Sequence, residues 1–445
     1  MFKRVLIANR GEIACRIIRA CRKLGVESVA VYSEADRDSL HVRMANVSIC
    51  IGPAESARSY LHIPSIISAA EISDVDAIHP GYGFLSENGH FADICRNLDI
   101  TFIGPSSGAM AKMSDKAGAR ALAKSCGVPT LPGSEGVIPD DEAGLKIARQ
   151  IGYPVIVKAS AGGGGRGIRV AHNEATLRIA MSSARAEAEA AFGDGSLYIE
   201  KFLTEPRHVE VQVLCDEHGN VIHLGERDCT TQRRHQKLIE ESPSPVVDKK
   251  IRTAMGDAAV KLCKAAGYTN AGTIEFLFEK GQFYFMEMNT RIQVEHPVTE
   301  MVTGLDLIEE QLRVAAGEPL RWRQKDIKHT GHAMEFRINA EDPDRKFAPC
   351  PGQVTLFVQP ESPGVRTDSF IYSGYRVTPY YDSMIAKLIV HAENRTACIE
   401  KAKMAMREFI LEGVKTTMPF HLQMLENIAF VNSEFDINFV DKLYS

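Results

Sequence analysis

Short apolar runs and amphipathic segments alternate along the first hundred residues of the chain. Residues 5–8 (VLIA) and 28–32 (SVAVY) are brief apolar runs bounded by turn residues, which is the pattern of buried strands. Between them, Glu12–Leu24 carries apolar side chains at helical spacing, and Gly25 ends the predicted helix. Strands and helices that alternate in this way predict a doubly wound, mostly parallel sheet.

A second pattern, from Met286 to Pro297, places a polar residue at every second position. These residues are Glu287, Asn289, Arg291, Gln293 and Glu295. In an extended chain they would share one face. The β-rich run just before them, 272–278, adds Glu275. Such groups are costly to desolvate unless a metal or ligand compensates them, so the pattern favours a binding site over a solvated edge strand.

The length of this stretch limits how it can be used. A straight strand from Glu287 to Glu295 would span about 26 Å, because each residue advances the chain by about 3.3 Å. That span is too long for one small reaction centre. We therefore predict that the strand ends near Asn289 or Thr290 and that the chain bends before His296.

Four consecutive glycines, 162–165, lie between two predicted strands, 153–158 and 168–170. Glycines cost backbone entropy and give a core no side chain, so they suit a movable flap whose amides approach a polyanion. Lys158 precedes the run and Arg166 lies within its segment. A flexible linker is the alternative, but strands bracket the run closely. The pattern GxxxxGK[ST] is absent, so this is not a Walker P-loop.

Two further segments could bind ligands. Residues 79–88 (HPGYGFLSEN) follow a predicted strand, where α/β sheets often bind ligands, but a long turn is an equal reading. Residues 226–241 (ERDCTTQRRHQKLIEE) are rich in cations, which usually indicates a solvated loop. In that segment Gln232, His235 and Lys237 alternate, so a strand there would direct all three at one anion.

Composition narrows the class of protein. The 445 residues require two or three domains, which we place at 1–113, 114–325 with a lid at 130–203, and 326–445. A net charge of −5 argues against general nucleic-acid binding, and no apolar run reaches membrane-spanning length. The ten scattered cysteines, without a CxxC pair, and the lack of a signal peptide indicate a reduced cytoplasmic protein.

The candidate chemistry falls into three groups. Lys116, Lys158 and the glycine flap would neutralise phosphate oxygens. Hard oxygen ligands that suit Mg²⁺ are supplied by Glu275, Glu287 and Asn289. A mixed-charge pocket beyond the metal would be formed by Lys237, Arg291, Gln293 and Glu295. A nicotinamide dehydrogenase is disfavoured because the turn after the first strand lacks GxGxxG.

Over essentially its whole length, the chain resembles the biotin carboxylase family of ATP-grasp enzymes. The matching segments are 7–21 (IANRGEIACRIIRAC), 79–88 (HPGYGFLSEN), 158–170 (KASAGGGGRGIRV), 226–237 (ERDCTTQRRHQK), 287–300 (EMNTRIQVEHPVTE) and 337–343 (RINAEDP). Two positions depart from the common pattern. Ala161 stands where another glycine is frequent, and Phe336 stands where a cysteine is common.

This resemblance implies both a fold and an activity. The fold would be a Rossmann-like N-terminal domain, a central ATP-grasp domain with a mobile lid, and a mixed α+β C-terminal domain. The activity would use ATP and bicarbonate to form carboxyphosphate, and would then carboxylate a ureido nitrogen of biotin, releasing ADP and phosphate. Mg²⁺ or Mn²⁺, as two ions, would accompany ATP.

The resemblance also assigns roles to residues. The implied nucleotide contacts are Lys116, Lys158, Gly164, Gly165, Glu200, Lys201, Phe202, Leu203, His208, Gln232 and His235, joined by Glu275 and Glu287. The implied metal ligands are Glu275, Glu287 and Asn289. Bicarbonate would be held by Lys237, Arg291, Gln293 and Val294, with Glu295 as the base that deprotonates it. Arg337 would stabilise the biotin enolate, and Tyr82 and Gly83 would line the biotin pocket.

The implied partners follow from what the chain lacks. No AMKM biotin-attachment sequence is present, so biotin would arrive on a separate carrier protein and a separate carboxyltransferase would complete the pathway. The family implies a homodimer and a role in acetyl-CoA carboxylase and fatty acid synthesis. The alternatives are a subunit of another acyl-CoA or pyruvate carboxylase, another ATP-grasp ligase such as a carbamoyl-phosphate or purine-pathway enzyme, and a non-catalytic nucleotide sensor.

Overall fold

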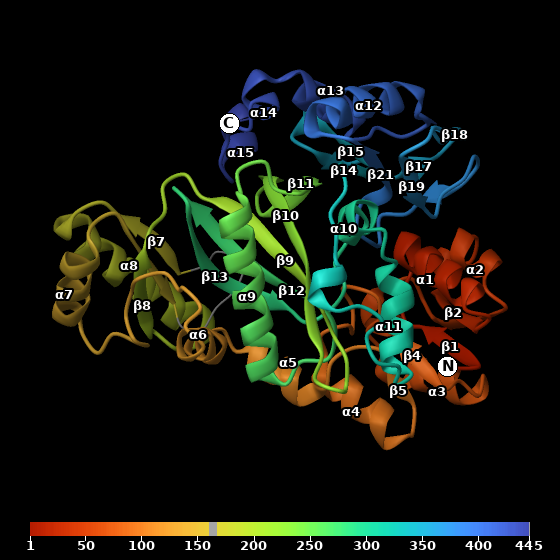
Figure 1. Ribbon diagram of the computed structural model, residues 1–445, viewed down its shortest axis with the longest axis horizontal. Coiled ribbons are helices and arrows are strands. Elements are labelled where there is room, and N and C mark those ends of the chain that lie inside the picture. The colour runs from red at the N-terminus through yellow and green to blue at the C-terminus, as the bar shows by residue number, and fades with distance from the viewer. Residues whose placement is uncertain (160–166, 445) are drawn as a thin grey trace.

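The N-terminal part of the chain forms a parallel five-stranded sheet in the order β3-β2-β1-β4-β5 (Figure 1). The computed structural model describes residues 1–159 and 167–444 of the chain. Strand β1 is central because it is buried on both faces: Val5 and Ile7 pack into one core cluster and Leu6 into another. The predicted doubly wound start is confirmed. Its elements are β1 (Arg4–Ile7), α1 (Gly11–Lys23), β2 (Glu27–Ser33), η1 (Glu34–Asp36), α2 (Leu40–Met44), β3 (Val47–Gly52), η2 (Ser56–Arg58), α3 (Ile63–Ile72), β4 (Ala77–His79), α4 (Gly89–Asn97), β5 (Thr101–Phe102) and α5 (Ser107–Ser114).

A second sheet of eight antiparallel strands runs through the middle of the molecule, in the order β13-β12-β9-β10-β11-β14-β21-β19. The pair β11–β14 joins the central segment of the chain to its C-terminal segment within one sheet. Helix α9 packs against β9 and β10, and α10 contacts β14, β10 and β21. The elements are β9 (Arg207–Cys215), β10 (Val221–Arg233), β11 (Gln236–Ser242), α9 (Lys249–Ala266), β12 (Asn270–Glu279), β13 (Gln282–Asn289), α10 (His296–Thr303), α11 (Leu307–Ala315), η3 (Gln324–Asp326), β14 (His332–Asn339), β19 (Val365–Ser369) and β21 (Met384–Ala392).

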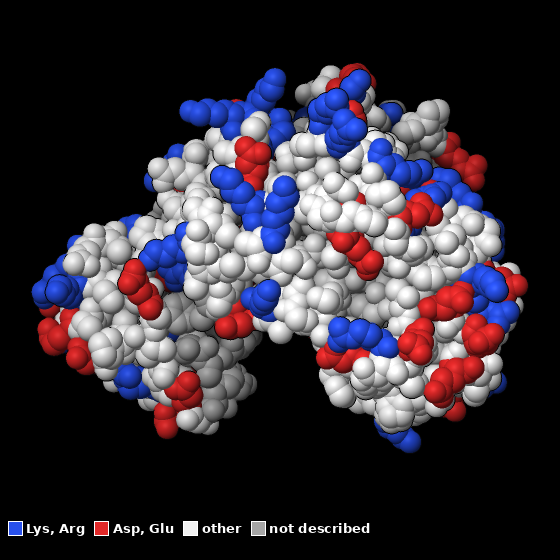
Figure 2. Space-filling view, turned by 60° about the horizontal axis from the view of Figure 1, so that its bottom comes forward, with Lys and Arg blue, Asp and Glu red and all other residues white. Residues whose placement is uncertain are grey.

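The lid has a hydrophobic core of its own. Helix α6 (Lys116–Ser125) precedes it in the chain. A three-stranded antiparallel sheet, β7-β6-β8, is covered by two helices. It stands apart on the left of Figure 1, and Figure 2 shows a deep hollow between this lobe and the rest of the molecule. Its elements are α7 (Asp141–Ile151), β6 (Val155–Ala159), β7 (Ile168–Ala171), α8 (Glu174–Phe192) and β8 (Leu197–Lys201).

The C-terminal segment adds helices and short strand pairs around β14, β21 and β19, as expected for a mixed α+β domain. Helix α12 packs on β21 and β14. The remaining elements are β15 (Glu341–Asp342), η4 (Pro343–Arg345), β16 (Ala348–Pro349), β17 (Gly352–Gln353), β18 (Leu356–Val358), β20 (Arg376–Val377), α12 (Arg395–Glu408), β22 (Ile410–Glu412), α13 (Met418–Glu426), α14 (Ile428–Val431) and α15 (Phe439–Leu443). None of the helices that the structure describes combines the length and apolar character needed to cross a bilayer.

The predicted break in the polar stretch is confirmed. Strand β13 ends at Asn289, an irregular segment follows, and α10 begins at His296. The prediction of one strand through Gln232, His235 and Lys237 is wrong. Instead, β10 and β11 form a hairpin with Arg234 and His235 in its turn, both at positive φ (48° and 65°). Gln232 and Lys237 still come together, because they are register partners across this hairpin.

Candidate active site

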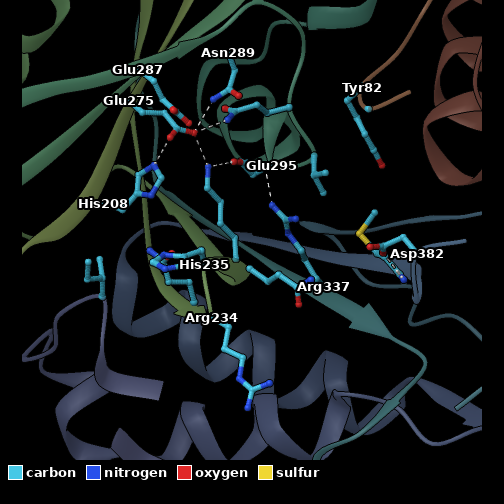
Figure 3. A pocket seen from close by; sticks show the side chains of 18 of the residues that line it. Tyr82, His208, Arg234, His235, Glu275, Glu287, Asn289, Glu295, Arg337 and Asp382 are labelled. Atoms are coloured by element: carbon cyan, nitrogen blue, oxygen red, sulfur yellow. Dashed lines mark hydrogen bonds and ion pairs between the residues drawn. The ribbon is translucent and has the colours of Figure 1, made fainter. Parts of the chain in front are cut away.

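A cavity of about 1460 Å³ lies between the lid, the central sheet and the N-terminal part. Of the site residues predicted from the sequence and described by the structure, all except Glu200 line it. Gly164 and Gly165 lie outside the described residues. Strands β9, β10, β11, β12, β13 and β14 supply the floor, and Tyr82 and Gly83 line the cavity from the N-terminal part. Figure 3 shows Tyr82 across the cavity from His208.

Lys237 is the centre of this floor. Its Nζ donates to Glu210 Oε2 at 2.7 Å, to Glu295 Oε1 at 2.6 Å and to Glu275 Oε1 at 3.2 Å. Burial by itself would lower the pKa of Lys237, but the surrounding anionic groups raise it well above its usual value. The ammonium therefore stays charged and holds three buried carboxylates around one point.

Glu295 is the best candidate for a base. It is buried, and its second oxygen accepts a hydrogen bond from Arg337 Nη2 at 2.9 Å. Burial raises its pKa, but Lys237 and Arg337 outweigh this effect and lower the pKa below 4.5. Arg337 is fixed on its other side by Glu240, through a hydrogen bond of 2.6 Å from Nε. A carboxylate kept ionised in this way can accept a proton from a bound substrate.

The predicted metal ligands lie on neighbouring strands. Glu275 on β12 and Glu287 on β13 are register partners, and both point into the cavity in Figure 3. Asn289 Nδ2 donates to Glu275 Oε1 at 2.7 Å. The Glu287 side chain is 38% exposed and lies 3.5 Å from Lys116 Nζ. Two carboxylates and one carboxamide on one face are a donor set of hard oxygens, which fits Mg²⁺ or Mn²⁺.

His208 adds a buried imidazole beside this set. Its Nε2 lies 3.3 Å from Glu275 Oε2 and 3.6 Å from Glu210 Oε2, but makes no well-aligned hydrogen bond among the described residues. Burial lowers the pKa of His208, whereas Glu275 raises it, and the net value is about 9. His208 is therefore a cation near neutral pH, which suits a place close to an anionic ligand.

Arg291 is bound to Glu87 and Asn289 in this structure. Its Nε pairs with Glu87 Oε2 at 3.1 Å, and its Nη2 donates to Asn289 Oδ1 at 3.1 Å. The other oxygen of Glu87 accepts hydrogen bonds from the backbone N–H and the hydroxyl of Thr290. Arg291 lines the cavity, but Glu87 from the 79–88 segment holds it where β13 ends.

The lid contributes two lysines with different surroundings. Lys158 Nζ pairs with Glu200 Oε2 at 2.6 Å, and Glu200 also binds Arg120 of α6. Glu200 is thus buried behind Lys158 and orients it, which explains why it does not line the cavity. Lys201 Nζ donates to the carbonyls of Gly152 and Tyr153, at 3.0 and 2.9 Å, and so braces the lid.

Sequence reasoning missed several residues that build this floor. Arg227 lies in the segment whose composition predicts a solvated, cation-rich loop, yet its side chain is fully buried and donates to Glu210, Gln212 and Gln293. Glu210 joins Arg227 to Lys237. The alternation of residues 208, 210 and 212 along β9 was the signal for this polar face, because all three side chains point to one side of the sheet.

Comparison with known proteins agrees with this geometry. Three family descriptions match successive parts of the chain: "Biotin carboxylase, N-terminal domain" over 1–110, "Carbamoyl-phosphate synthase L chain, ATP binding domain" over 115–323, and "Biotin carboxylase C-terminal domain" over 335–442. Biotin carboxylase 1 of Bacillus subtilis is 56% identical and is matched over 99% of this chain and 98% of its own.

Solved structures extend the comparison. A biotin carboxylase from Campylobacter jejuni, in complex with β,γ-ATP, superposes with a TM-score of 0.93 at 53% identity, over 99% of both chains. The biotin carboxylase domain of Hydrogenobacter thermophilus 2-oxoglutarate carboxylase, a dimer with MgADP, ADP and bicarbonate, gives 0.91 at 48% identity, over 100% of this chain and 99% of that one.

The fold and the cavity together define an ATP-dependent ligase of the ATP-grasp class, in which a lid stands over a sheet that carries the site residues. Within that class, the chain belongs to the biotin carboxylase family. Its activity is the ATP-dependent carboxylation of biotin, and the expected fold class is confirmed.

Proposed function

We propose that the chain carboxylates biotin borne on a separate carrier protein, as the first half-reaction of an acetyl-CoA carboxylase. We also propose that the chain is divided into three domains, at residues 1–113, 114–325 (with the lid at 130–203) and 326–445. The observation that carries the proposal is the buried floor where Lys237 and Arg337 together hold Glu295 ionised. The match of the chain to 98% of the length of Bacillus subtilis biotin carboxylase 1 supports the biotin carboxylase half-reaction.

Each group on the floor has a place in the reaction. Glu295 removes the proton of bicarbonate, which Lys237, Gln293 and Arg291 hold. The oxygen so freed attacks the γ-phosphorus of ATP, the bond from phosphorus to the bridging oxygen of ADP breaks, and carboxyphosphate forms. Mg²⁺ held by Glu275, Glu287 and Asn289, accompanied by a second ion, would neutralise phosphate charge. Lys116, Lys158 and His208 add positive charge around the nucleotide.

The second step moves the carboxyl group to biotin. Arg337 stabilises the negative charge that develops on the ureido oxygen when the nitrogen loses its proton. The nitrogen bonds to the carboxyl carbon as the bond from that carbon to the phosphate oxygen breaks, and the departing phosphate takes the proton that the nitrogen loses. Tyr82 and Gly83 form the opposite wall of the cavity, so biotin enters between them and Arg337. We further propose a homodimer, as in the domain dimer of the Hydrogenobacter protein.

The test of the activity is phosphate release from ATP by the purified chain, with and without bicarbonate and free biotin. We expect turnover that needs bicarbonate and rises with biotin. Turnover that is indifferent to both would contradict the proposal.

A second experiment tests the pathway. An extract of the source cells is depleted of this chain, supplied with labelled bicarbonate, and given acetyl-CoA, pyruvate or 2-oxoglutarate. Adding the chain back should restore label transfer to acetyl-CoA. Restoration with pyruvate or 2-oxoglutarate alone would support another carboxylase instead.

A further inference from the structure

Lys387 on β21 is a lysine with no exposed side-chain surface, and it does not line the cavity. Its Nζ donates to the carbonyl oxygen of Val294 at 2.6 Å and lies 3.2 Å from Glu12 Oε1. Both partners line the cavity, but they come from different parts of the chain. The lysine thus contacts two walls of the cavity from behind.

The first contact acts on the residue that precedes the proposed base. The carbonyl of Val294 belongs to the same planar peptide unit as the backbone nitrogen of Glu295. Fixing this oxygen therefore fixes the orientation of the backbone from which the Glu295 side chain starts. This segment has no regular secondary structure between β13 and α10, so the strands themselves do not hold it.

The second contact acts on the opposite wall. Glu12 Oε1, the oxygen near Lys387, also accepts a hydrogen bond from the hydroxyl of Tyr82. The other oxygen of Glu12 has no hydrogen-bond partner among the described residues. The position of Tyr82 therefore depends on a carboxylate that in turn depends on Lys387 for its charge balance.

The charge state of Lys387 is consistent with this double contact. Burial alone would lower its pKa, but Glu12, Glu335 and Asp368 raise it above 10.5, so the ammonium stays charged. Arg337 on β14 and Asp368 on β19 are its register partners on the two neighbouring strands. Buried ion pairs add little net stability compared with apolar residues, so stability alone is a weak reason to place a lysine here.

We propose that Lys387 is a positioning residue that ties the bicarbonate subsite to the biotin subsite, through the carbonyl of Val294 and through Glu12 and Tyr82. The inference rests on the proposed function, because the roles of these two subsites are proposed there. Lys387 touches neither substrate. It sets the distance and orientation between the walls that hold them.

The two contacts can be separated by substitution. Lys387→Met removes both, and we expect the KM values for bicarbonate and for free biotin each to rise by about tenfold or more. Glu12→Gln leaves the bond from Lys387 to Val294 in place, so only the KM for biotin should rise. Lys401→Met is the matched control, because Lys401 also donates to two backbone carbonyls, those of Pro363 and His391, but lies away from the cavity.

Folding is checked separately from positioning. Binding of MgADP, measured by calorimetry, should be unchanged in every variant, since the nucleotide half of the cavity is not touched. If Lys387→Met fails to fold, the double variant Lys387→Met with Glu12→Gln removes both charges of the Lys387–Glu12 pair and leaves Glu335, 4.0 Å from Lys387 Nζ in the wild type, unchanged. It should fold and still show the raised KM for bicarbonate, because the carbonyl of Val294 has still lost its donor.

The outcomes are distinguishable. An unchanged KM for bicarbonate in Lys387→Met, or in the double variant, would overturn the positioning role. So would identical changes in Glu12→Gln and Lys387→Met. Wild-type protein without turnover dependent on bicarbonate and biotin would instead contradict the proposed function.

Discussion

Replacement of Arg337 by methionine tests whether the cavity floor keeps Glu295 ionised. The guanidinium donates to Glu240 from Nε at 2.6 Å and to Glu295 from Nη2 at 2.9 Å. Methionine keeps most of the aliphatic stem but removes both charge-assisted hydrogen bonds. Lys237 would then be the one charged group that still donates a hydrogen bond to Glu295 within the described part of the chain.

The size of the effect follows from this geometry. A hydrogen bond to a charged group contributes about 1.5–3 kcal/mol, and one pKa unit corresponds to about 1.4 kcal/mol. Burial, which already raises the pKa of Glu295, would be opposed mainly by Lys237 after the substitution. We therefore expect the pKa of Glu295 to rise by about one to two units.

The assay is bicarbonate-dependent phosphate release from ATP, measured over a series of pH values without biotin, so that a role of Arg337 towards biotin does not enter. A base works when it is deprotonated, so the rate falls as the pH drops through its pKa. The acidic limb of the profile should move to higher pH by about one to two units in Arg337→Met.

Arg395→Met is the matched control. Arg395 holds another buried carboxylate of β11, Glu241, with Nε at 2.7 Å from Oε2, but it does not line the cavity. This variant should lose stability and keep the wild-type acidic limb. If the profiles of Arg337→Met, Arg395→Met and wild type coincide, then Arg337 does not set the ionisation of the base and the reasoning is refuted.

Three other substitutions test separate parts of the site. Arg291, which Glu87 holds, is a proposed contact of bicarbonate and not of the nucleotide. Arg291→Ala should therefore keep MgATP binding in calorimetry yet lose most carboxybiotin formation, and unchanged carboxylation would remove Arg291 from the mechanism. Glu287→Gln should raise the Mg²⁺ concentration needed for ATP binding about tenfold, since a charged ligand is lost; an unaltered requirement would count against the ligand role. Burial raises the pKa of Glu240 from 4.5 to about 7. The folded protein therefore binds this proton more tightly than the unfolded chain does. The free energy of unfolding should then fall by about 3 kcal/mol as the pH rises from 4.5 to about 7. Glu240→Gln should flatten that slope in urea unfolding between about pH 4.5 and pH 7, and an equal slope in both proteins would contradict the raised pKa.

The sequence predicted the parts of the fold that local patterns determine. The strand–helix alternation up to residue 103 depends on short apolar runs, and β1 and α1 begin within a residue of the prediction. The end of β13 at Asn289 followed from the fixed rise of a strand, because one straight element could not serve a single reaction centre.

The rest depends on contacts between distant residues. The pairing of Glu87 with Arg291 and of Lys387 with Val294 joins residues that are 204 and 93 positions apart. The burial of Arg227 could not be read from its own segment, because the carboxylate that compensates it, Glu210, lies on another strand.

The continuous eight-stranded sheet limits how the chain can be divided in the laboratory. Strand β11 takes its partner β14 from beyond residue 325, with register pairs from Ile239–Phe336 to Ser242–Ala333. A fragment that ended at residue 325 would leave β11 as a bare edge, and the complementary fragment would expose β14. Such edges recruit strands from other molecules. Separately expressed fragments should therefore aggregate, or reassemble with each other when co-expressed, so chimaeras with related carboxylases should exchange residues 114–445 as one piece.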